Sequence, residues 1–401
     1  MTEMAQNTSH LAPVGLGIAG LGMAGAVMVH AAAAHQGFVL RAGADPHPAP
    51  RQAFVRDHNA RAYADVRELV ADPEVEVVYI ATPHQFHAPH AILAAEHGKH
   101  IILEKPMALT LADCDAIIAA VERHGVQLVV GHTHAFDPAV RLMRDLIEQG
   151  ELGTLGMILS FNYTNFLYRP RRPEELDTAR GGGILFNQVP HQIDTVRLLA
   201  GGLARSVRAQ AGALDPTRPT EGHCSALLQF RGGVAASLVY SGYDHFDSDE
   251  WHFGIGERGA AKRLDHGAAR RALERAADET RARTESFAYG AAAGSLPPHQ
   301  PHFGITIVTG AEADMRASAD GVIVYGRDGA REFHLPHGSG MPGRREVLNE
   351  MRAAIRGDRR PVHDGRWGKA TVEVALAILR SSREGREIAL EHQVAVDGSS
   401  G

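Results

Sequence analysis

The sequence predicts an α/β protein with two domains: an N-terminal doubly wound parallel sheet, and a C-terminal α+β domain with a mostly antiparallel, open sheet. Three observations support this. A chain of 401 residues is longer than one ordinary core accommodates. Apolar strands alternate with helices of about 10–15 residues in the first third, which is typical of βαβ units. The strands after residue 154 alternate apolar and polar residues, which is typical of a sheet with one solvated face.

The first domain is expected to span residues 14–150, after a loose N-terminus at 1–13. Its strands are short apolar runs, and each is followed by a segment with helical periodicity, so the strands are expected to pair in parallel. The expected strands cover residues 14–20, 38–44, 75–81, 100–104 and 126–131, and the expected helices cover residues 23–36, 48–59, 87–97, 110–124 and 138–149.

The second domain is expected to span residues 151–392, with a loose tail at 393–401. It carries one helix over residues 185–200 and closes with two amphipathic helices over 345–357 and 368–385. Its expected strands cover residues 155–164, 205–213, 223–231, 234–242, 303–309 and 321–326.

Residues 256–300 interrupt this pattern, because the segment is charged, rich in Ala and Arg, and poor in large apolar residues. Such a composition cannot form a core. We expect a mobile, solvated helix or loop, and the alternative is a lid over the substrate.

The charge pattern excludes several classes of partner. The formal net charge is −6, and no Lys/Arg block forms a basic stripe, so nucleic acid and anionic membranes are not expected partners. The N-terminus lacks the basic and apolar regions of a signal peptide. His30 and His35 interrupt the Ala-rich run near residue 30, so that run cannot span a bilayer. We expect a soluble protein.

The cysteine and histidine patterns bear on redox state and metals. Cys114 and Cys224 lie far apart without CxxC spacing, so free thiols in a reducing cytoplasm are expected. The chain has 24 histidines but no HExxH and no Cys/His quartet with zinc spacing, so no metal site is expected. The histidine clusters that raise the question are His84/His87/His90 and His132/His134.

A G-x-G-x-x-G motif follows the first strand and opens the first helix, as Gly20-Leu-Gly22-Met-Ala-Gly25. Glycines at this spacing allow a tight turn, a close approach of the backbone to a pyrophosphate, and packing of the helix whose N-terminus then faces the phosphates. The motif therefore predicts a dinucleotide site. The residues expected to contact the cofactor here are Gly20, Gly22, Met23 and Ala24.

Asp45 ends the second strand, about 20 residues after the glycine motif. A carboxylate there accepts hydrogen bonds from the adenosine ribose diol and repels a 2′-phosphate, so the expected cofactor is NAD. Arg41 and Arg51 lie close enough in the sequence to keep NADP as the less favoured alternative.

Glu104-Lys105-Pro106 ends a buried strand at the carboxyl edge of the predicted sheet, where ligands bind in doubly wound folds. A desolvated lysine beside a cationic nicotinamide has a lowered pKa and can accept a proton. The alternative is a surface ion pair at the end of a strand.

The chain resembles the glucose–fructose oxidoreductase/inositol dehydrogenase/MocA family of NAD(P)-dependent oxidoreductases. The resemblance rests on three ordered segments, GIAGLGMAG, IATPHQFHAPHAILAAEHGKHIILEKPMAL and GGGILFNQVPHQIDTVRLLAG, and on EGREIAL near the end. It implies a Rossmann-type domain and a C-terminal α+β domain whose open sheet often mediates oligomerisation. A homo-oligomer, a dimer or a tetramer, is therefore expected.

The resemblance also implies site residues. Lys105 falls on the family's active-site lysine, and His191 on the histidine of its Asp-x-x-x-His helix, whose aspartate is replaced by Asn187. One helical turn would stack Asn187 on His191, where an amide orients the ring but adds no charge. Either Lys105 then carries more of the proton transfer, or the reaction needs a weaker base, or Asn187 binds a substrate hydroxyl. The further residues expected at the cofactor are Thr82, Pro83, His84, His87, Glu104 and Lys105. His87 and His100 also match family positions that are structural.

A narrower resemblance, to phthalate 4,5-cis-dihydrodiol dehydrogenases, rests on residues 165–202 and the 256–300 insertion. Arginines on a Pro-stiffened segment can clamp carboxylates bidentately, and the alternative is a solvated basic loop. The residues expected to bind substrate are Arg169, Arg171, Arg172, Asn187, His191 and His134.

The sequence therefore predicts an NAD-dependent dehydrogenase for a carboxylated aromatic cis-dihydrodiol, which it oxidises to the catechol. Lys105 and His191 are expected to relay the hydroxyl proton. One alternative is a sugar or inositol dehydrogenase on the same scaffold. Another, from a different class, is a non-catalytic NAD-binding regulator.

Overall fold

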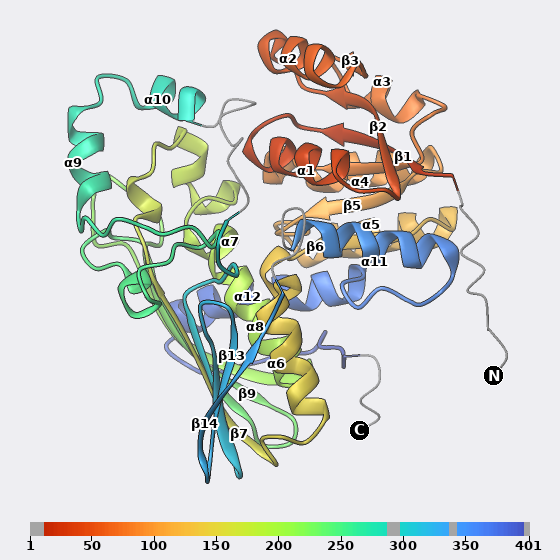
Figure 1. Ribbon diagram of the computed structural model, residues 1–401. Helices are drawn as coiled ribbons and strands as arrows, with labels where there is room; N and C mark the ends of the chain where they lie inside the picture. The colour runs from red at the N-terminus through yellow and green to blue at the C-terminus, as the bar shows by residue number, and fades with distance from the viewer. Residues whose placement is uncertain (1–11, 287–296, 337–342, 397–401) are drawn as a thin grey trace, which may run out of the picture.

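Two β-sheets organise the protein in a computed structural model that describes residues 12–286, 297–336 and 343–396 (Figure 1). One sheet is six-stranded and parallel, and the other is nine-stranded and mostly antiparallel. This arrangement confirms the predicted α/β fold class with two different sheets.

The N-terminal sheet has the strand order β3-β2-β1-β4-β5-β6, with every neighbouring pair parallel. Helices cover both faces, with α1 and α2 on one and α3, α4 and α5 on the other. The strand order reverses between β1 and β4, which is where doubly wound folds bind ligands at the carboxyl ends of their strands. The strands are β1 (Val14–Ala19), β2 (Phe38–Ala44), β3 (Arg61–Tyr63), β4 (Val77–Ile80), β5 (His100–Glu104) and β6 (Leu128–Gly131). The helices are α1 (Met23–Ala33), α2 (Pro48–His58), α3 (Val66–Ala71), α4 (His87–Glu96) and α5 (Leu111–His124).

Two elements here were not predicted, the short strand β3 and the helix α3. A three-residue strand carries no usable alternation. Helix α3 did leave a signal, because Asp65 caps it and Glu68 bonds back to the Asp65 amide, forming a capping box.

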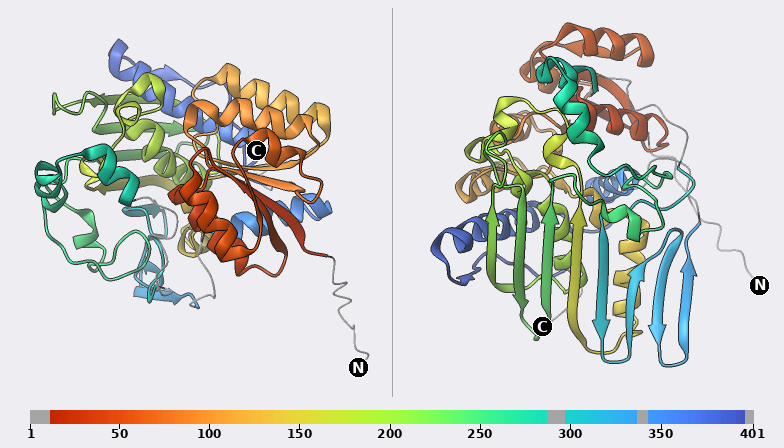
Figure 2. Two further views of the ribbon diagram at one scale, coloured as in Figure 1. Left: turned by 90° about the horizontal axis from the view of Figure 1, so that it is seen from above. Right: turned by 90° about the vertical axis from the view of Figure 1, so that its left-hand side faces the viewer.

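The C-terminal sheet has the order β14-β13-β12-β11-β7-β10-β9-β8-β15, and β7 and β10 form its parallel pair. Helices α6, α8 and α12 cover one face, while the other face is open toward the viewer in the right panel of Figure 2. Strands β12, β14 and β15 were not predicted. The strands are β7 (Leu155–Tyr163), β8 (Ala204–Gly212), β9 (His223–Phe230), β10 (Ala235–Ser241), β11 (Ile305–Gly310), β12 (Ala313–Ala317), β13 (Gly321–Gly326), β14 (Gly329–His334) and β15 (Ile388–Ala389).

Two helices, α6 and α11, pack against a different sheet from the one expected. Helix α6 buries Met143 and Leu146 against the C-terminal sheet, so the expected domain boundary near residue 150 moves to the start of this helix. Helix α11 buries Val347 and Met351 against the N-terminal sheet. The apolar face of an amphipathic helix can pack against either sheet, so periodicity alone could not show which sheet each helix covers. These helices are α6 (Pro138–Glu148), α7 (Ile184–Asn187), α8 (Val189–Leu199), α11 (Arg344–Arg356) and α12 (Gly365–Glu384).

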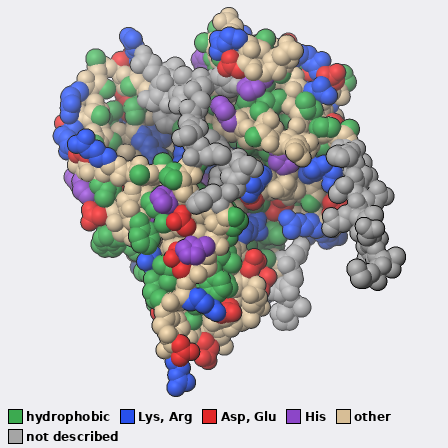
Figure 3. Space-filling model, in the orientation of Figure 1, with side chains coloured by type: hydrophobic (Ala, Val, Ile, Leu, Met, Phe, Trp, Pro, Cys, Tyr) green, Lys and Arg blue, Asp and Glu red, His purple; other side chains and the backbone are tan. Residues whose placement is uncertain are grey.

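The charged insertion contains helices α9 (Ala268–Arg275) and α10 (Glu279–Ser286), while residues 287–296 lie outside the described residues. Helix α9 has no buried residue, and it contributes to the core only through Ala269 and Leu273, which are partly buried against it. Its basic side chains gather at the upper left of Figure 3. The helix is not simply solvated, however, because Arg270 donates to the Tyr243 carbonyl and stacks 3.7 Å from the Tyr168 ring centroid.

The C-terminal segment packs against the protein over more residues than expected. Residues 1–11 and 397–401 lie outside the described residues. The expected loose tail at 393–401 nevertheless begins with packed residues, because Gln393 accepts a 2.9 Å hydrogen bond from Arg197, and Val396 is buried. Among the described helices, none is long and apolar enough to cross a membrane.

Candidate active site

The glycine motif forms a sharp turn between β1 and α1. Gly20 has φ +93°, and a Cβ on Gly25 would lie 1.9 Å from the Gly20 carbonyl oxygen, so both positions require glycine. A Cβ on Gly22 would meet none of the described residues within 4 Å, so those residues leave space above the turn. No side chain in the described part of the chain caps α1, and the first turn of this helix carries no acidic residue. The turn therefore presents helix amides to a phosphate, and it fits the pyrophosphate of a dinucleotide.

Asp45 lies beside this turn, as its spacing predicts. Its carboxylate accepts hydrogen bonds from the backbone amides of Leu21, at 3.0 Å, and His47, at 2.9 Å. Arg51 donates instead to the backbone carbonyls of Asp45 and Pro46, at 2.6 and 2.9 Å, so this arginine is engaged at the β2–α2 junction.

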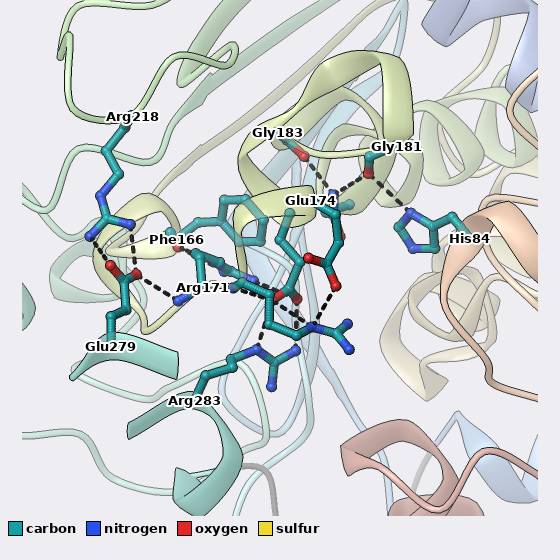
Figure 4. Close-up of polar contacts among 12 residues, drawn as sticks. His84, Phe166, Arg171, Glu174, Gly181, Gly183, Arg218, Glu279 and Arg283 are labelled. Atoms are coloured by element: carbon teal, nitrogen blue, oxygen red, sulfur yellow. Dashed lines mark hydrogen bonds and ion pairs between the residues drawn. The ribbon is translucent and has the colours of Figure 1, made fainter. Parts of the chain in front are cut away.

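The loop after β4 is held by its histidines. The ring nitrogens of buried His87 lie 2.8 and 2.9 Å from the carbonyl oxygens of Pro106 and Thr82, so this side chain ties two strand-end loops together. His84 lies 3.0 Å from the Gly181 carbonyl oxygen (Figure 4). Burial, reinforced by His87 and Lys105, lowers the His84 pKa to about 3, so this ring is neutral.

Lys105 follows β5 directly and reaches across to the second domain. Its Nζ donates a 2.5 Å hydrogen bond to the backbone carbonyl of Asn187. Burial, together with the positive charges of Arg344 and Arg171, lowers the lysine pKa to about 8 against the opposing effect of Glu104. Lys105 can therefore lose its proton near neutral pH, which an exposed lysine cannot do.

His191 lies in α8 and is buried, with no partner for its Nδ1 within the described part of the chain. Burial lowers its pKa well below the usual value, and the positive charges of Lys105 and His134 lower it further. The ring packs perpendicular to that of His134, with centroids 4.6 Å apart, and against Phe303. The imidazole is therefore neutral and weakly basic, and it can pass on a proton only transiently.

The expected stacking of Asn187 on His191 is wrong. The single helix predicted for 185–200 is broken, because Pro190 cannot donate the backbone bond that would continue α7 into α8. Asn187 Nδ2 donates instead to the carbonyl oxygens of Gly181, at 3.0 Å, and Gly183, at 2.7 Å. The amide thus shapes the glycine loop and aims its own backbone carbonyl at Lys105.

His134 carries the carboxylate partners that His191 lacks. Its Nδ1 lies 2.7 Å from Asp137 Oδ2, and its Nε2 lies 3.3 Å from Glu257 Oε1. Burial alone would lower the pKa of His134, but these two carboxylates outweigh it and raise the pKa to about 9. His134 is therefore a cation beside a neutral His191. We call Lys105, His191, His134 and Glu257 the catalytic cluster.

The arginine segment is largely engaged within the chain (Figure 4). Arg171 is buried, donates to the Phe166 carbonyl oxygen at 2.7 and 3.2 Å, and stacks 3.8 Å from the Phe166 ring centroid. Arg172 lies 3.3 Å from Glu174 and 3.4 Å from Glu175. Arg169 uses only its Nε, which donates to Asn165 Oδ1 at 2.8 Å. Its two terminal nitrogens have no hydrogen-bond partner among the described residues.

Helix α10 binds the arginine segment, residues 169–172, through hydrogen bonds and ion pairs. Glu279 accepts from the Arg171 amide at 2.7 Å and from the Arg218 guanidinium at 2.6 and 3.0 Å (Figure 4). Arg283 pairs with Glu175 at 2.7 Å. The insertion is therefore attached by ion pairs rather than left in solvent.

Comparison with known proteins decides the family. Residues 14–132 match the model of an oxidoreductase family with an NAD-binding Rossmann fold, and residues 140–262 match the model of the GFO/IDH/MocA C-terminal domain. A 1-carboxy-3-chloro-3,4-dihydroxycyclohexa-1,5-diene dehydrogenase of Comamonas testosteroni is 42% identical over 356 residues, which are 86% of this chain and 88% of that protein. This chain belongs to the Gfo/Idh/MocA family.

Solved structures agree with this placement. A Bordetella bronchiseptica RB50 protein described as a dehydrogenase superimposes with a TM-score of 0.90 at 45% identity, covering 94% of this chain and 100% of that one. Levoglucosan dehydrogenase with NADH bound shares the fold, with a TM-score of 0.72 at 21% identity, covering 94% of this chain and 99% of that one. The chain is an oxidoreductase, and its cofactor is a nicotinamide dinucleotide of the NAD type.

The Gfo/Idh/MocA motifs located Lys105 and His191 but not the residues around them. Sequence reasoning missed Asp137 and Glu257. Asp137 is three residues from His134, a spacing that was visible in the sequence. Glu257 left no such signal, because it lies 123 residues from His134. Among the described residues, no group of three or more His, Cys, Asp or Glu is arranged to hold a metal ion.

Proposed function

We propose that this chain oxidises a carboxylated cyclohexadiene diol to the corresponding catechol. The observation that carries the proposal is the convergence of Lys105, with a pKa of about 8, and neutral His191 at the carboxyl edge of the N-terminal sheet. The Comamonas testosteroni relative, 42% identical, is named for a carboxylated dihydroxycyclohexadiene, which supports this substrate class.

The chemistry needs a proton acceptor beside the reacting hydroxyl. A bound NAD would supply the acceptor for the hydride of the carbinol carbon. Unprotonated Lys105 takes the hydroxyl proton, with His191 as its neighbour in the relay. The resulting hydroxy-dienone enolises to the catechol, and aromatisation makes the oxidation favourable. Burial and the positive charge of His134 keep His191 neutral and weakly basic, which leaves Lys105 as the stronger proton acceptor of the pair.

Arg169 is the arginine best able to bind a substrate carboxylate. Its terminal guanidinium nitrogens have no partner among the described residues, and its positive charge acts to lower the pKa of Glu257 and of Tyr240, so it lies near the catalytic cluster. Arg171 and Arg172 support the segment through Phe166 and the glutamates. Arg169→Ala should raise KM for carboxylated diols about 10-fold or more, with a much smaller change for NAD. Arg172→Ala is the matched control, with a smaller effect expected.

The test of the proposal is reduction of NAD across a panel of carboxylated cis-dihydrodiols, the same diols without carboxylates, sugars and inositols. The highest kcat/KM should belong to the carboxylated diols. Faster oxidation of a sugar or inositol would assign the chain to that class instead. NAD binding without reduction by any of them would support a regulator.

NAD rather than NADP is the proposed cofactor, because Asp45 lies beside the glycine turn and is already oriented by two backbone amides. Steady-state kinetics with both cofactors test this preference. Asp45→Ser should reduce the difference between kcat/KM with NAD and kcat/KM with NADP. A higher kcat/KM with NADP than with NAD in the unchanged protein would contradict the proposal.

A cytoplasmic homo-oligomer is also proposed. The open face of the C-terminal sheet carries an apolar pocket lined by Phe161, Phe246 and Trp251, and Trp251 is exposed. Cys114 and Cys224 are both free and buried, which fits a reducing compartment. Sedimentation of the protein and of Trp251→Arg tests the assembly, because burial of that face predicts that the variant dissociates.

A further inference from the structure

A short turn of the C-terminal domain, residues 256–259, touches the N-terminal domain through two consecutive side chains. Glu257 pairs with His134 in the catalytic cluster. Arg258 extends in another direction, and its Nη2 lies 3.6 Å from the sulfur of Met23, which is 235 residues away in the chain. Met23 is the first residue of α1, so Arg258 lies at the glycine motif.

The turn is held firmly in this position. The Gly259 amide donates to the Gly256 carbonyl at 2.8 Å, and the His302 amide donates to the Glu257 carbonyl at 3.1 Å. Gly259 has φ +80°, and a Cβ there would lie 2.2 Å from the His299 carbonyl oxygen, so only glycine fits. Arg258 therefore extends from a fixed backbone, which limits the entropy lost when its side chain binds a ligand.

Positive charge exceeds negative charge around the Arg258 guanidinium, because the carboxylate of neighbouring Glu257 is already paired with His134. The N-terminus of α1 carries the positive end of the helix dipole, and its first turn holds no acidic residue. Arg258 forms no ion pair with a carboxylate in the described part of the chain. A cation at the positive end of a helix is unfavourable unless an anion lies between them, and the space above Gly22 is open for one.

We infer that Arg258 binds the pyrophosphate of the cofactor and is a binding residue contributed by the C-terminal domain. The α1 amides hold the phosphates from one side, and the guanidinium pairs with them from the other. Glu257 directly precedes Arg258, so the same turn would contact the cofactor through Arg258 and contacts His134 through Glu257. This inference rests on the cofactor site and not on the identity of the oxidised substrate.

The test measures binding rather than turnover. Calorimetric titration with NAD and with ADP-ribose is carried out on the unchanged protein, Arg258→Ala, Arg258→Lys and Arg263→Ala. Arg263 is an exposed arginine on the same loop and serves as the matched control. Arg258→Ala should weaken both ligands about 10-fold, and Arg258→Lys should recover most of that loss. Added salt should weaken ligand binding less in Arg258→Ala than in the unchanged protein.

Two results would overturn the inference. One is an ADP-ribose affinity of Arg258→Ala equal to that of Arg263→Ala. The other is an equal loss in Arg258→Ala and Arg258→Lys with unchanged salt dependence, which would mean that the side chain only packs on Met23. The unfolding temperature of each ligand-free variant verifies that the fold is intact.

Discussion

Two buried histidine sites lie one turn apart along α8, and their histidines respond to burial in opposite ways. His191 belongs to the catalytic cluster, and its pKa lies well below the usual value. Asp194, three residues on, faces buried His363, whose Nε2 lies 3.3 Å from Asp194 Oδ2 and whose Nδ1 lies 3.5 Å from Glu350 Oε1. Burial opposes protonation of His363, but the two carboxylates raise its pKa above the usual value.

The difference shows that neighbouring charges, more than depth, decide what a buried imidazole can do. His191 has positively charged neighbours, which oppose its protonation, so it remains neutral beside Lys105. His363 lies between carboxylates and holds α8, α11 and the start of α12 together as part of an ion-paired network. The first site should therefore govern turnover and the second stability.

The largest effect is expected in turnover at the first site. Lys105→Ala and His191→Ala should each lower kcat about 10²–10⁴-fold, with Lys105→Ala at least as severe, because its pKa places the proton transfer near neutral pH. Lys99→Ala is the control at the other end of β5 and should leave kcat unchanged, as steady-state kinetics would show. A His191→Ala rate near that of the unchanged protein would make His191 structural.

At the second site, Asp194→Ala should destabilise the fold by about 3–5 kcal/mol, because it leaves the Trp367 indole N–H unpaired and removes one partner of His363. Urea denaturation measures the loss. Asp194→Asn, which retains a hydrogen-bond acceptor for Trp367, should lose less. At urea concentrations below the unfolding transition, kcat of the Asp194→Ala variant should remain close to that of the unchanged protein. A kcat loss as large as that of Lys105→Ala would contradict the assignment of Asp194 to stability alone.

Asn187→Asp would add a carboxylate at the residue whose backbone carbonyl accepts from Lys105. The negative charge favours the protonated forms of Lys105 and His191, so the acidic limb of the kcat/KM profile should move to higher pH. The variant also loses the two amide bonds to Gly181 and Gly183, at a cost of about 1–3 kcal/mol of stability. Asn187→Ala loses the same bonds without adding charge, so an equal shift in both variants would exclude the electrostatic explanation.

The smallest effect concerns the pH dependence of stability. The pKa of His134 is about 9 in the folded state against 6.5 unperturbed, so its stabilisation is complete below pH 6.5 and is lost as the pH rises through 9. Glu257→Gln removes one carboxylate partner and should reduce that loss by about 1 kcal/mol or less. Unfolding free energies at several pH values measure it. An unchanged pH slope would mean that Asp137 alone keeps His134 charged.

The sequence predicted those parts of the site that lie in continuous segments. The glycine motif, Asp45 and Lys105 each sit at a strand end, where a few adjacent residues fix the backbone. His191 was located by its motif, but its pairing with Asn187 was not, although Pro190 was a visible sign that the helix would break. The arginine segment was recognised, while its engagement by Glu279 depended on how the insertion folds back.

The sequence by itself determined the two sheets, the cofactor turn, Lys105 and His191, because strand periodicity, glycine spacing and strand-end residues act over short stretches of chain. Only the tertiary structure decided which sheet α6 and α11 cover, that Glu257 meets His134, and that Arg258 reaches Met23. These contacts join residues more than a hundred positions apart. They depend on how whole layers pack and on which charges that packing brings together, and no local pattern records either one.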